Sequence, residues 1–274
     1  MTNTLMFHRK TRSPWKSAAC KFKPWMLGSA ALLTMSLPAH ADWSLGIAGI
    51  SSDGSFKGID RDNFAVPMIG YEGERVYFRG LELGYRLNPH APDTPREQRS
   101  PHEWTLMVTA APFRFRPNDS DDLQMRELDS RSFSAELALD YKYRSRFGTA
   151  ELRAGQDVRG NGHRASASYS YPVSTDFRRW QINPAIGVTF ISSGYTDYYY
   201  GVTAEESARS GLEEYSSQDA FNPFIRLSGY YRFNQHWNMF GAVVGTRLSS
   251  KIANSPMADG RYVNTVILAV AYSF

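Results

Sequence analysis

The sequence predicts an all-β chain that forms a transmembrane, antiparallel, up-and-down β-barrel of about twelve strands, with a ten-stranded barrel as the alternative. Apolar and polar residues alternate with period two over segments of ten or more residues, which is longer than most strands of soluble sheets. Aromatic residues lie at the ends of the apolar faces, as at the two membrane–water interfaces of a barrel. A soluble β-sandwich also alternates, but strand length and ring placement favour the barrel.

The first 41 residues are predicted to be a cleaved signal peptide, and residues 42–274 to be the barrel. The leader has a basic start, an apolar run at 26–38 that is too short to span a bilayer comfortably, and the small-x-small cleavage pattern Ala39-His40-Ala41. It carries six basic residues and no acidic residue, so the formal net charge falls from +4 to −2 on cleavage, and a nucleic-acid partner loses its support. The single cysteine, Cys20, leaves with the leader, which excludes a lipid anchor and disulfide or thiolate chemistry in the mature chain.

The final segment, YVNTVILAVAYSF, gives the clearest strand. Its even positions, from Tyr262 to Tyr272, are large and mostly apolar, with rings at both ends, while its odd positions are smaller. At about 2.5 Å of depth per residue, the ten steps between these tyrosines cover roughly 25 Å, the height of the apolar band of an outer-membrane barrel. Tyr262 and Tyr272 are therefore predicted to lie in the membrane girdle.

The same alternation predicts eleven further strands. The full set is 43–52, 64–72, 75–87, 103–116, 132–145, 147–158, 162–173, 179–192, 195–204, 221–233, 237–249 and 262–274. Short turns at 73–74, 159–161, 193–194 and 234–236 are predicted to be periplasmic, and longer loops at 88–102, 205–220 and 250–261 extracellular. The segment 117–131 and the break at Arg146 do not fit this order, and Ala110-Ala111-Pro112 breaks the phase of its strand, as a bulge would.

The stretch YTDYYYGVTAEE, residues 195–206, places four tyrosines beside two glutamates. Because a phenol ring suits a boundary that is dry at one end and wet at the other, Tyr195, Tyr198, Tyr199 and Tyr200 are predicted to lie in the aromatic girdle, with both glutamates in water beyond it. The alternative is a strand edge in a soluble protein.

Charged residues on the opposite faces of the strands are predicted to line the lumen. They are Glu82, Arg86, Glu136, Asp140, Lys142, Arg144, Glu151, Arg153, Asp157, Arg226, Arg232 and Arg247. Since both signs occur on neighbouring strands, a salt-bridged interior that holds the barrel's shape is favoured over a selective pore, which usually shows a ring of one sign.

No enzymatic or metal site is predicted, and no cofactor. His90, His102, His163 and His236 are isolated and lie in or beside turns or loops. In the acidic stretch that starts at Asn118, the sixth position is not glycine and the twelfth is not glutamate, so it is interpreted as a polar turn and not a calcium loop.

The chain resembles the MipA/OmpV family of outer-membrane proteins. The resemblance rests on YTDYYYGVTAEES (195–207), TRLSSKIANSPM (246–257), PMIGYEGERVYFRG (67–80) and the ending LAVAYSF (268–274); NDSDDLQMRELD (118–129) fits only loosely. It implies an outer-membrane barrel in contact with lipid, inserted by the barrel assembly machinery, which recognises a terminal aromatic such as Phe274. It also implies the roles of that family: scaffolding of a murein transglycosylase and a murein synthase, or passage of small solutes.

Three functions therefore remain open. The chain is expected to be a scaffolding barrel that docks periplasmic murein enzymes, with a narrow pore for small solutes as the alternative and a membrane-embedded hydrolase well behind.

Overall fold

A computed structural model describes residues 43–274, except 90–93, 95–97, 99 and 112–113. The predicted leader, residues 1–41, and His90 lie outside the described residues. None of the helices in the described part of the chain is long and apolar enough to cross a membrane.

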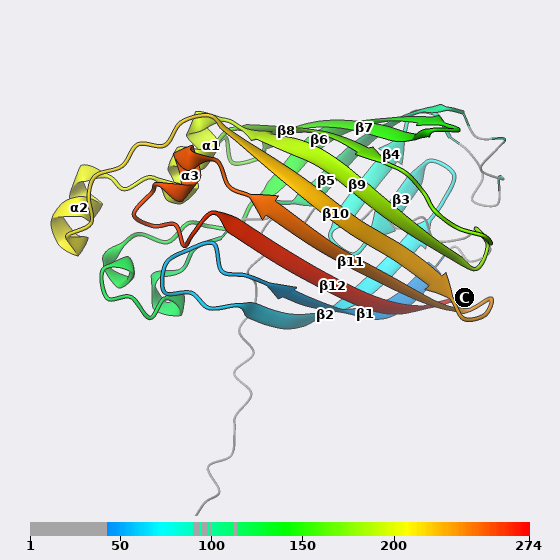
Figure 1. Cartoon of the computed structure of the whole chain (residues 1–274), viewed down its shortest axis with the longest axis horizontal. Helices are drawn as coiled ribbons and strands as arrows, with labels where there is room; N and C mark the ends of the chain where they lie inside the picture. The colour runs from blue at the N-terminus through cyan, green and yellow to red at the C-terminus, as the bar shows by residue number, and fades with distance from the viewer. Residues whose placement is uncertain (1–42, 90–93, 95–97, 99, 112–113) are drawn as a thin grey trace, which may run out of the picture.

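Twelve antiparallel strands form one closed barrel in which each strand pairs with the next and β12 pairs with β1 (Figure 1). The strands are β1 (Trp43–Ser52), β2 (Asp62–Glu72), β3 (Val76–Arg79), β4 (Glu82–Arg86), β5 (His102–Ala110), β6 (Ala135–Ser145), β7 (Gly148–Asp157), β8 (His163–Ser170), β9 (Trp180–Ile191), β10 (Ala220–Arg232), β11 (Trp237–Arg247) and β12 (Tyr262–Ser273). The described parts of the loops contain three short α-helices, α1 (Ser193–Tyr200), α2 (Ala204–Ser210) and α3 (Ser250–Ala253), and two 3₁₀ helices, η2 (Pro117–Asp119) and η3 (Met125–Glu127). Because the sheet is closed, no strand edge is left to pair with another chain.

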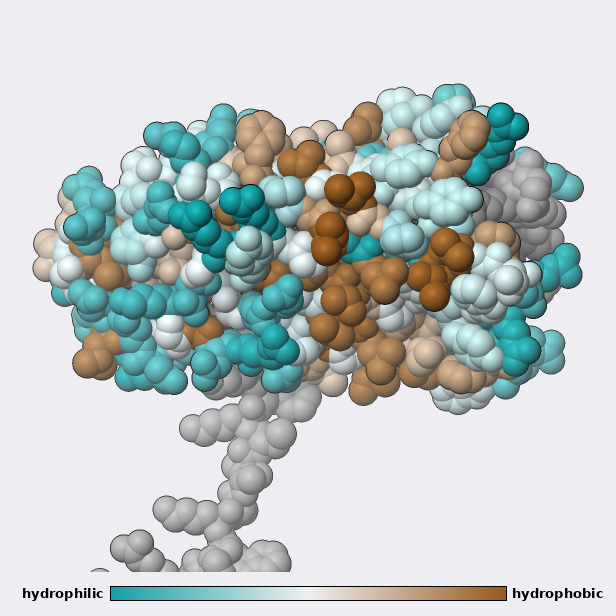
Figure 2. Space-filling view, viewed as in Figure 1, coloured by the Kyte–Doolittle hydropathy of each residue, from teal (hydrophilic) through white to brown (hydrophobic). Residues whose placement is uncertain are grey.

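The period-two pattern separates an outer wall from an inner wall. On β12, Val266 and Leu268 are exposed on the outside, whereas Ile267 and Ala269 are buried on the inside. Figure 2 shows apolar residues spread over the strands and hydrophilic residues gathered at the end that carries the helices. An exposed apolar wall of this kind is stable only when lipid covers it.

The count of twelve strands is confirmed, but two of the predicted strands are wrong, and the errors cancel. The segment 75–87 is two short strands, β3 and β4, that turn at Gly80, whose φ of 62° is in the left-handed region. The segment 195–204 is no strand, because it contains α1 and the start of α2.

The additional hairpin also resolves the two irregularities in loop order. The long segment 111–134 lies at the same end as 53–61, 192–219 and 248–261, and the short turn at Arg146-Phe147 lies at the end that carries both Trp43 and Phe274. Since bacterial barrels have short periplasmic turns and longer extracellular loops, the end with 111–134, 192–219 and 248–261 is extracellular. The predicted sides of three connections are therefore wrong: 87–101 is periplasmic, whereas 158–162 and the predicted turn at 193–194, which is the start of α1, are extracellular. The expected bulge coincides with the end of β5 at Ala110, and Pro112 is outside the described residues.

The β3–β4 hairpin is held from the inside of the barrel. The Tyr77 ring lies over Gly84, its cross-strand neighbour, so closely that a Cβ on Gly84 would overlap the ring. The Tyr77 hydroxyl donates to Glu82 Oε1 at 2.7 Å, and the Arg79 and Arg86 guanidinium carbons lie 4.2 and 4.7 Å from the ring centre. Glycine at position 84 is thus required by the close approach of an aromatic ring.

Candidate functional site in the barrel interior

The inner wall from β2 to β8 is a network of ion pairs. At its centre, Asp140 on β6 is almost fully buried and lies 2.9 Å from Arg153 Nε on β7 and 3.2 Å from Lys142 Nζ. Arg153 also contacts Glu151 at 3.2 Å. Cations and carboxylates alternate in space here, so Asp140, Lys142, Glu151 and Arg153 each have a neighbour of opposite charge, as burial of charge requires.

The network continues on both sides of this centre. Towards β2, Glu72 pairs with Arg79 and, at 2.7 Å, with Arg86. Towards β8, Glu136 pairs with Arg164 at 3.1 Å. At the periplasmic end Arg144 pairs with Glu103 at 2.7 Å, and at the extracellular end Asp157 accepts from the Ser134 hydroxyl.

The predicted lumen residues lie on the inner phase of their strands, with one exception. Arg247, at the extracellular end of β11, is on the outer phase and exposed, in the same alternation as Val243. The prediction for Arg247 is therefore wrong. Both faces of β11 are largely apolar, so its alternation does not distinguish the inner face from the outer face. Arg247 lies at the end of the strand, beyond the apolar band, where a charge is tolerated on either face.

The prediction that the tyrosines of residues 195–200 form a lipid-facing girdle is also wrong. Tyr195, Tyr199 and Tyr200 are 1–2% exposed inside the extracellular loops, and Tyr198 packs against the same cluster. Burial raises the pKa of Tyr200 to about 12. By contrast, Tyr262 and Tyr272 occupy the outer phase at opposite ends of β12, and Tyr272 stacks on His236 with ring centres 5.2 Å apart.

The extracellular loops form a second hydrophobic core, which we call the loop core. Its buried residues are Phe56, Ile59, Phe115, Met125, Leu128, Ile191, Tyr195, Tyr199, Tyr200, Val202, Leu212, Ala220, Leu248, Ile252, Met257 and Val263. Four loops contribute, and Ile191, Ala220 and Val263 come from the extracellular ends of β9, β10 and β12. The loop core is thus continuous with the end of the barrel.

The geometry of the loop core places it over the barrel axis. The loops β1–β2, β5–β6 and β9–β10 leave a twelve-strand barrel at intervals of one third of its circumference. Yet Phe56 from the first lies 5.1 Å from Phe115 of the second and 5.0 Å from Tyr200 of the third, between ring centres. Three loops from such separate positions therefore meet across the extracellular mouth of the barrel, and we expect the loop core to close that end.

A buried ion pair connects the β5–β6 loop to the β9–β10 loop and stabilises their packing in the loop core. Arg131, in the β5–β6 loop, lies 2.8 Å from Glu206 Oε1 in α2, and Glu206 also accepts from the backbone N–H of Asp129 at 2.9 Å and of Thr203 at 3.1 Å. Burial by itself raises the pKa of Glu206, but these N–H groups and the Arg131 guanidinium outweigh it and lower the pKa. Thr203 and Glu206 form a capping box at the start of α2.

A second ion pair joins the β1–β2 loop to the β5–β6 loop. Lys57 Nζ lies 2.9 Å from Asp122 Oδ2, and this bond, more than the partial burial that opposes it, lowers the pKa of Asp122. Its neighbour Ser120 donates to the Lys57 carbonyl oxygen at 2.8 Å. The acidic stretch that starts at Asn118 therefore connects the β1–β2 loop to the β5–β6 loop. Among the described residues, no group of three or more histidine, cysteine or acidic side chains is arranged to hold a metal ion.

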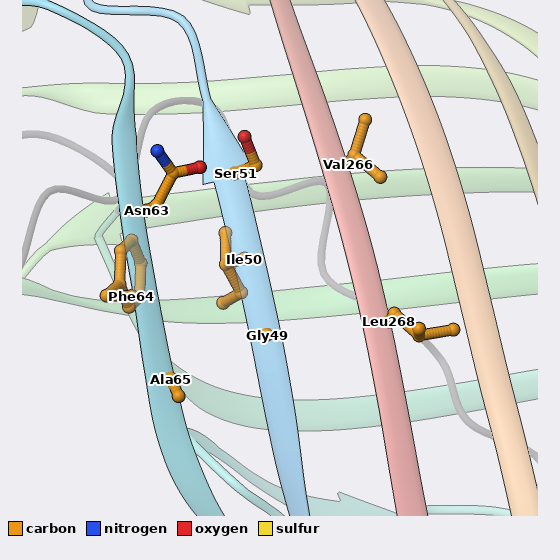
Figure 3. A pocket seen from close by; sticks show the side chains of 8 residues that line it. All are labelled: Gly49, Ile50, Ser51, Asn63, Phe64, Ala65, Val266 and Leu268. Atoms are coloured by element: carbon orange, nitrogen blue, oxygen red, sulfur yellow. The ribbon is translucent and has the colours of Figure 1, made fainter.

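The outer wall carries one shallow notch of about 490 Å³ across β2, β1 and β12. Figure 3 shows the side chains around it, among which Gly49, Ser51, Asn63 and Ala65 are smaller or more polar than the rest of the wall. Leu268 and Val266 border it on β12. The notch faces the bilayer and is separate from the interior.

A closed barrel with an apolar outer wall and a charged inner wall defines an outer-membrane β-barrel protein. The family model described as "MltA-interacting protein MipA" matches residues 45–274. The chain therefore belongs to the MipA family.

Named relatives agree with this class. The chain is 33% identical over 258 residues to "MltA-interacting protein" of Escherichia coli (strain K12), covering 93% of this chain and 99% of the relative. It is 30% identical to "Putative outer membrane protein YiaT" of the same strain, covering 89% and 96%. "Outer membrane protein OmpV" of Vibrio cholerae is 23% identical, with 86% and 88% covered. The protein is an outer-membrane protein.

Sequence reasoning missed several residues that the structure brings together. Glu72, Arg79, Glu103 and Arg164 belong to the interior network, and period-two alternation within their strands was the available signal. The Arg131–Glu206 pair was also missed. The spacing Thr203-x-x-Glu206, followed by Gly211, predicts a capped helix, which could have identified α2 but not its partner on a distant loop.

Proposed function

We propose that the protein is a scaffolding barrel that docks periplasmic murein-remodelling enzymes, a murein transglycosylase first and a murein synthase second. The observation that carries the proposal is the loop core, because a barrel closed at its extracellular end presents its accessible surface to the periplasm. The relative named "MltA-interacting protein" supports a transglycosylase as the partner. Outer-membrane lipid would cover the apolar outer wall. The barrel assembly machinery would recognise the exposed Phe274.

The periplasmic connection 171–179, between β8 and β9, suits a docking role. It exposes Tyr171, Val173 and Phe177 together with Arg178 and Arg179. Exposed aromatic and arginine side chains are the residue types that interfaces favour. The loop is also anchored, because the Tyr230 hydroxyl donates to the Phe177 carbonyl oxygen and the Arg232 N–H donates to the Arg179 carbonyl oxygen.

Capture of the folded barrel by an immobilised transglycosylase of the MltA type tests this proposal. We expect detergent-solubilised barrel, with its fold checked by a heat-dependent gel shift, to be retained. The charge reversal Arg178→Glu should reduce retention several-fold, because a rim charge governs encounter with a partner. The matched reversal Lys251→Glu, in an extracellular loop, should leave it unchanged. No retention of the wild type, or an equal loss with Lys251→Glu, would contradict the proposal.

A narrow pore is the second candidate. It is supported by the partly solvent-accessible inner wall of β8 and β9, where Ser168, Ser170 and Asn183 are half-buried. A pore would pass ions through the wild-type barrel, whereas a scaffold closed by the loop core would not. The named relatives are outer-membrane and MltA-interacting proteins, and on that ground we propose that the protein is not an enzyme.

A further inference from the structure

Two arginines of the interior stand outside its ion-pair network. Arg226 and Arg232 lie on the inner phase of β10. Within the described part of the chain, no carboxylate lies within ion-pair distance of either guanidinium, although the charge of Glu151 acts on Arg226 from further away, and the buried Nε atom of each arginine donates to no protein group. By contrast, Arg153 on β7 and Arg164 on β8, three and two strands away, each contact a carboxylate. Both arginines are half-buried, and a partly desolvated guanidinium whose Nε has no protein partner is costly, so this side of the lumen is suited to an anion.

The wall beside Arg226 is uncharged and carries small or polar side chains. The cross-strand neighbours of Arg226 are the small Ala185 on β9 and Val244 on β11, and neither carries a charge. Further along the same face, Asn183 pairs with Ser228, and Ser170 on β8 pairs with Ala185. These hydroxyl and amide side chains are half-buried, so solvent reaches them. They can donate to and accept from the hydroxyl groups of a ligand.

A row of cations leads to this wall from the periplasmic end. Arg232 ends β10, and its backbone N–H donates to the Arg179 carbonyl oxygen at 2.7 Å. The Arg179 side chain itself lies against the outer wall, since its Nε donates at 3.1 Å to the hydroxyl of Tyr231 on the outer phase of β10, whereas Arg178 beside it is exposed at the rim and its charge acts on Arg232. Arg226 lies six residues further along the strand, or roughly 20 Å. Arginines thus mark the rim, the mouth and the interior on one side of the lumen, where they would raise the local concentration of anions.

We propose that the lumen is a binding pocket for a small hydroxylated anion that enters from the periplasm, such as a sugar bearing a carboxylate or a phosphate. Arg226 binds the anionic group, Arg232 receives it at the mouth, and the serine and asparagine side chains of β8 to β10 bind the hydroxyl groups. The loop core makes the pocket a dead end. This inference goes beyond docking, since it concerns the interior and not the periplasmic rim.

Titration calorimetry of the folded, detergent-solubilised barrel tests the pocket. The probes are glucuronate, glucose 6-phosphate and glucose, which separate a carboxylate from a phosphate and both from a neutral sugar. We expect saturable binding of at least one anionic probe and none of glucose. Arg226→Gln should weaken that binding about tenfold, because a hydrogen bond to a charged group is worth about that factor.

Arg247→Gln is the matched control, since Arg247 is exposed on the outer face of the neighbouring strand β11. It should bind the anion like the wild type, and all variants should keep the heat-dependent gel shift of a folded barrel. The pocket is refuted if no anionic probe binds the wild type, if glucose binds equally well, or if Arg226→Gln and Arg247→Gln bind alike. Because the transglycosylase is absent from this titration, its outcome is independent of the docking proposal.

Discussion

Replacing Glu206 with glutamine is expected to open the loop core while leaving the barrel folded. The change leaves the Arg131 guanidinium, which is about nine-tenths buried, without its counter-charge. Removing one partner of a buried pair costs about 3–5 kcal/mol. That cost is comparable to the stabilisation from burying about two large apolar side chains in the loop core, at about 1.5–3 kcal/mol each. We expect trypsin to cleave the variant rapidly after Arg209 or Arg126, with the heat-dependent gel shift retained.

Glu205→Gln is the control for this experiment, because Glu205 precedes Glu206 in α2 but is exposed. It should be cleaved like the wild type. Equal resistance of Glu206→Gln would mean that the pair does not hold the closure.

The same pair predicts how the closure responds to acid. The folded-state pKa of Glu206 is below its ordinary value of 4.5, so its stabilisation is complete above about pH 4.5 and is lost as the pH falls through the folded pKa. Hydrogen exchange of the α2 amides, corrected for intrinsic rates, should accelerate on acidification in the wild type. The extra acceleration should be absent from Glu206→Gln.

Replacing Asp140 with asparagine is expected to give the largest loss of barrel stability. It removes the carboxylate that faces both Lys142 and Arg153 and leaves only Glu151 to balance two buried cations. We expect the free energy of unfolding to fall by about 3 kcal/mol, measured by urea titration of the reconstituted barrel followed by the gel shift.

The matched variant Asp259→Asn, at an exposed position in the β11–β12 loop, should change stability by less than about 0.5 kcal/mol. Adding Arg153→Gln to Asp140→Asn should recover part of the loss, since it removes one of the unbalanced charges. A fall no larger than that of Asp259→Asn would refute a stabilising network.

The architecture could be predicted from the sequence because lipid and lumen impose a strict alternation on every strand. That alternation identifies the inner phase of β4, β6, β7 and β10, whereas the predicted number of strands is right only because the missed β3–β4 turn and the false strand at 195–204 cancel. It fails for residues 195–204, because the many tyrosines of YTDYYYGVTA are typical of a strand, whereas the segment contains α1. What decides its structure is contact with Phe56 and Phe115, which are distant in sequence. Period two could not reveal that contact.

The loop core itself could not be predicted for the same reason. Its residues come from four loops that are separated by whole hairpins, and each loop alone is polar with a few apolar side chains. Only closure of the barrel brings Phe56, Phe115 and Tyr200 together. The side of the 87–101 connection was likewise misassigned because length was used as the guide, whereas strand parity, set by the β3–β4 hairpin, decides it.

Single-channel recording in planar bilayers tests most directly whether the extracellular loops close this barrel. We expect the wild-type protein to give no stable unitary steps. A variant in which residues 203–211 are replaced by a short glycine–serine linker should give them, because it removes Glu206, the partner of Arg131, and Ser207, which donates to the Leu212 carbonyl oxygen. Stable steps of equal size in the wild type and the variant would contradict the account.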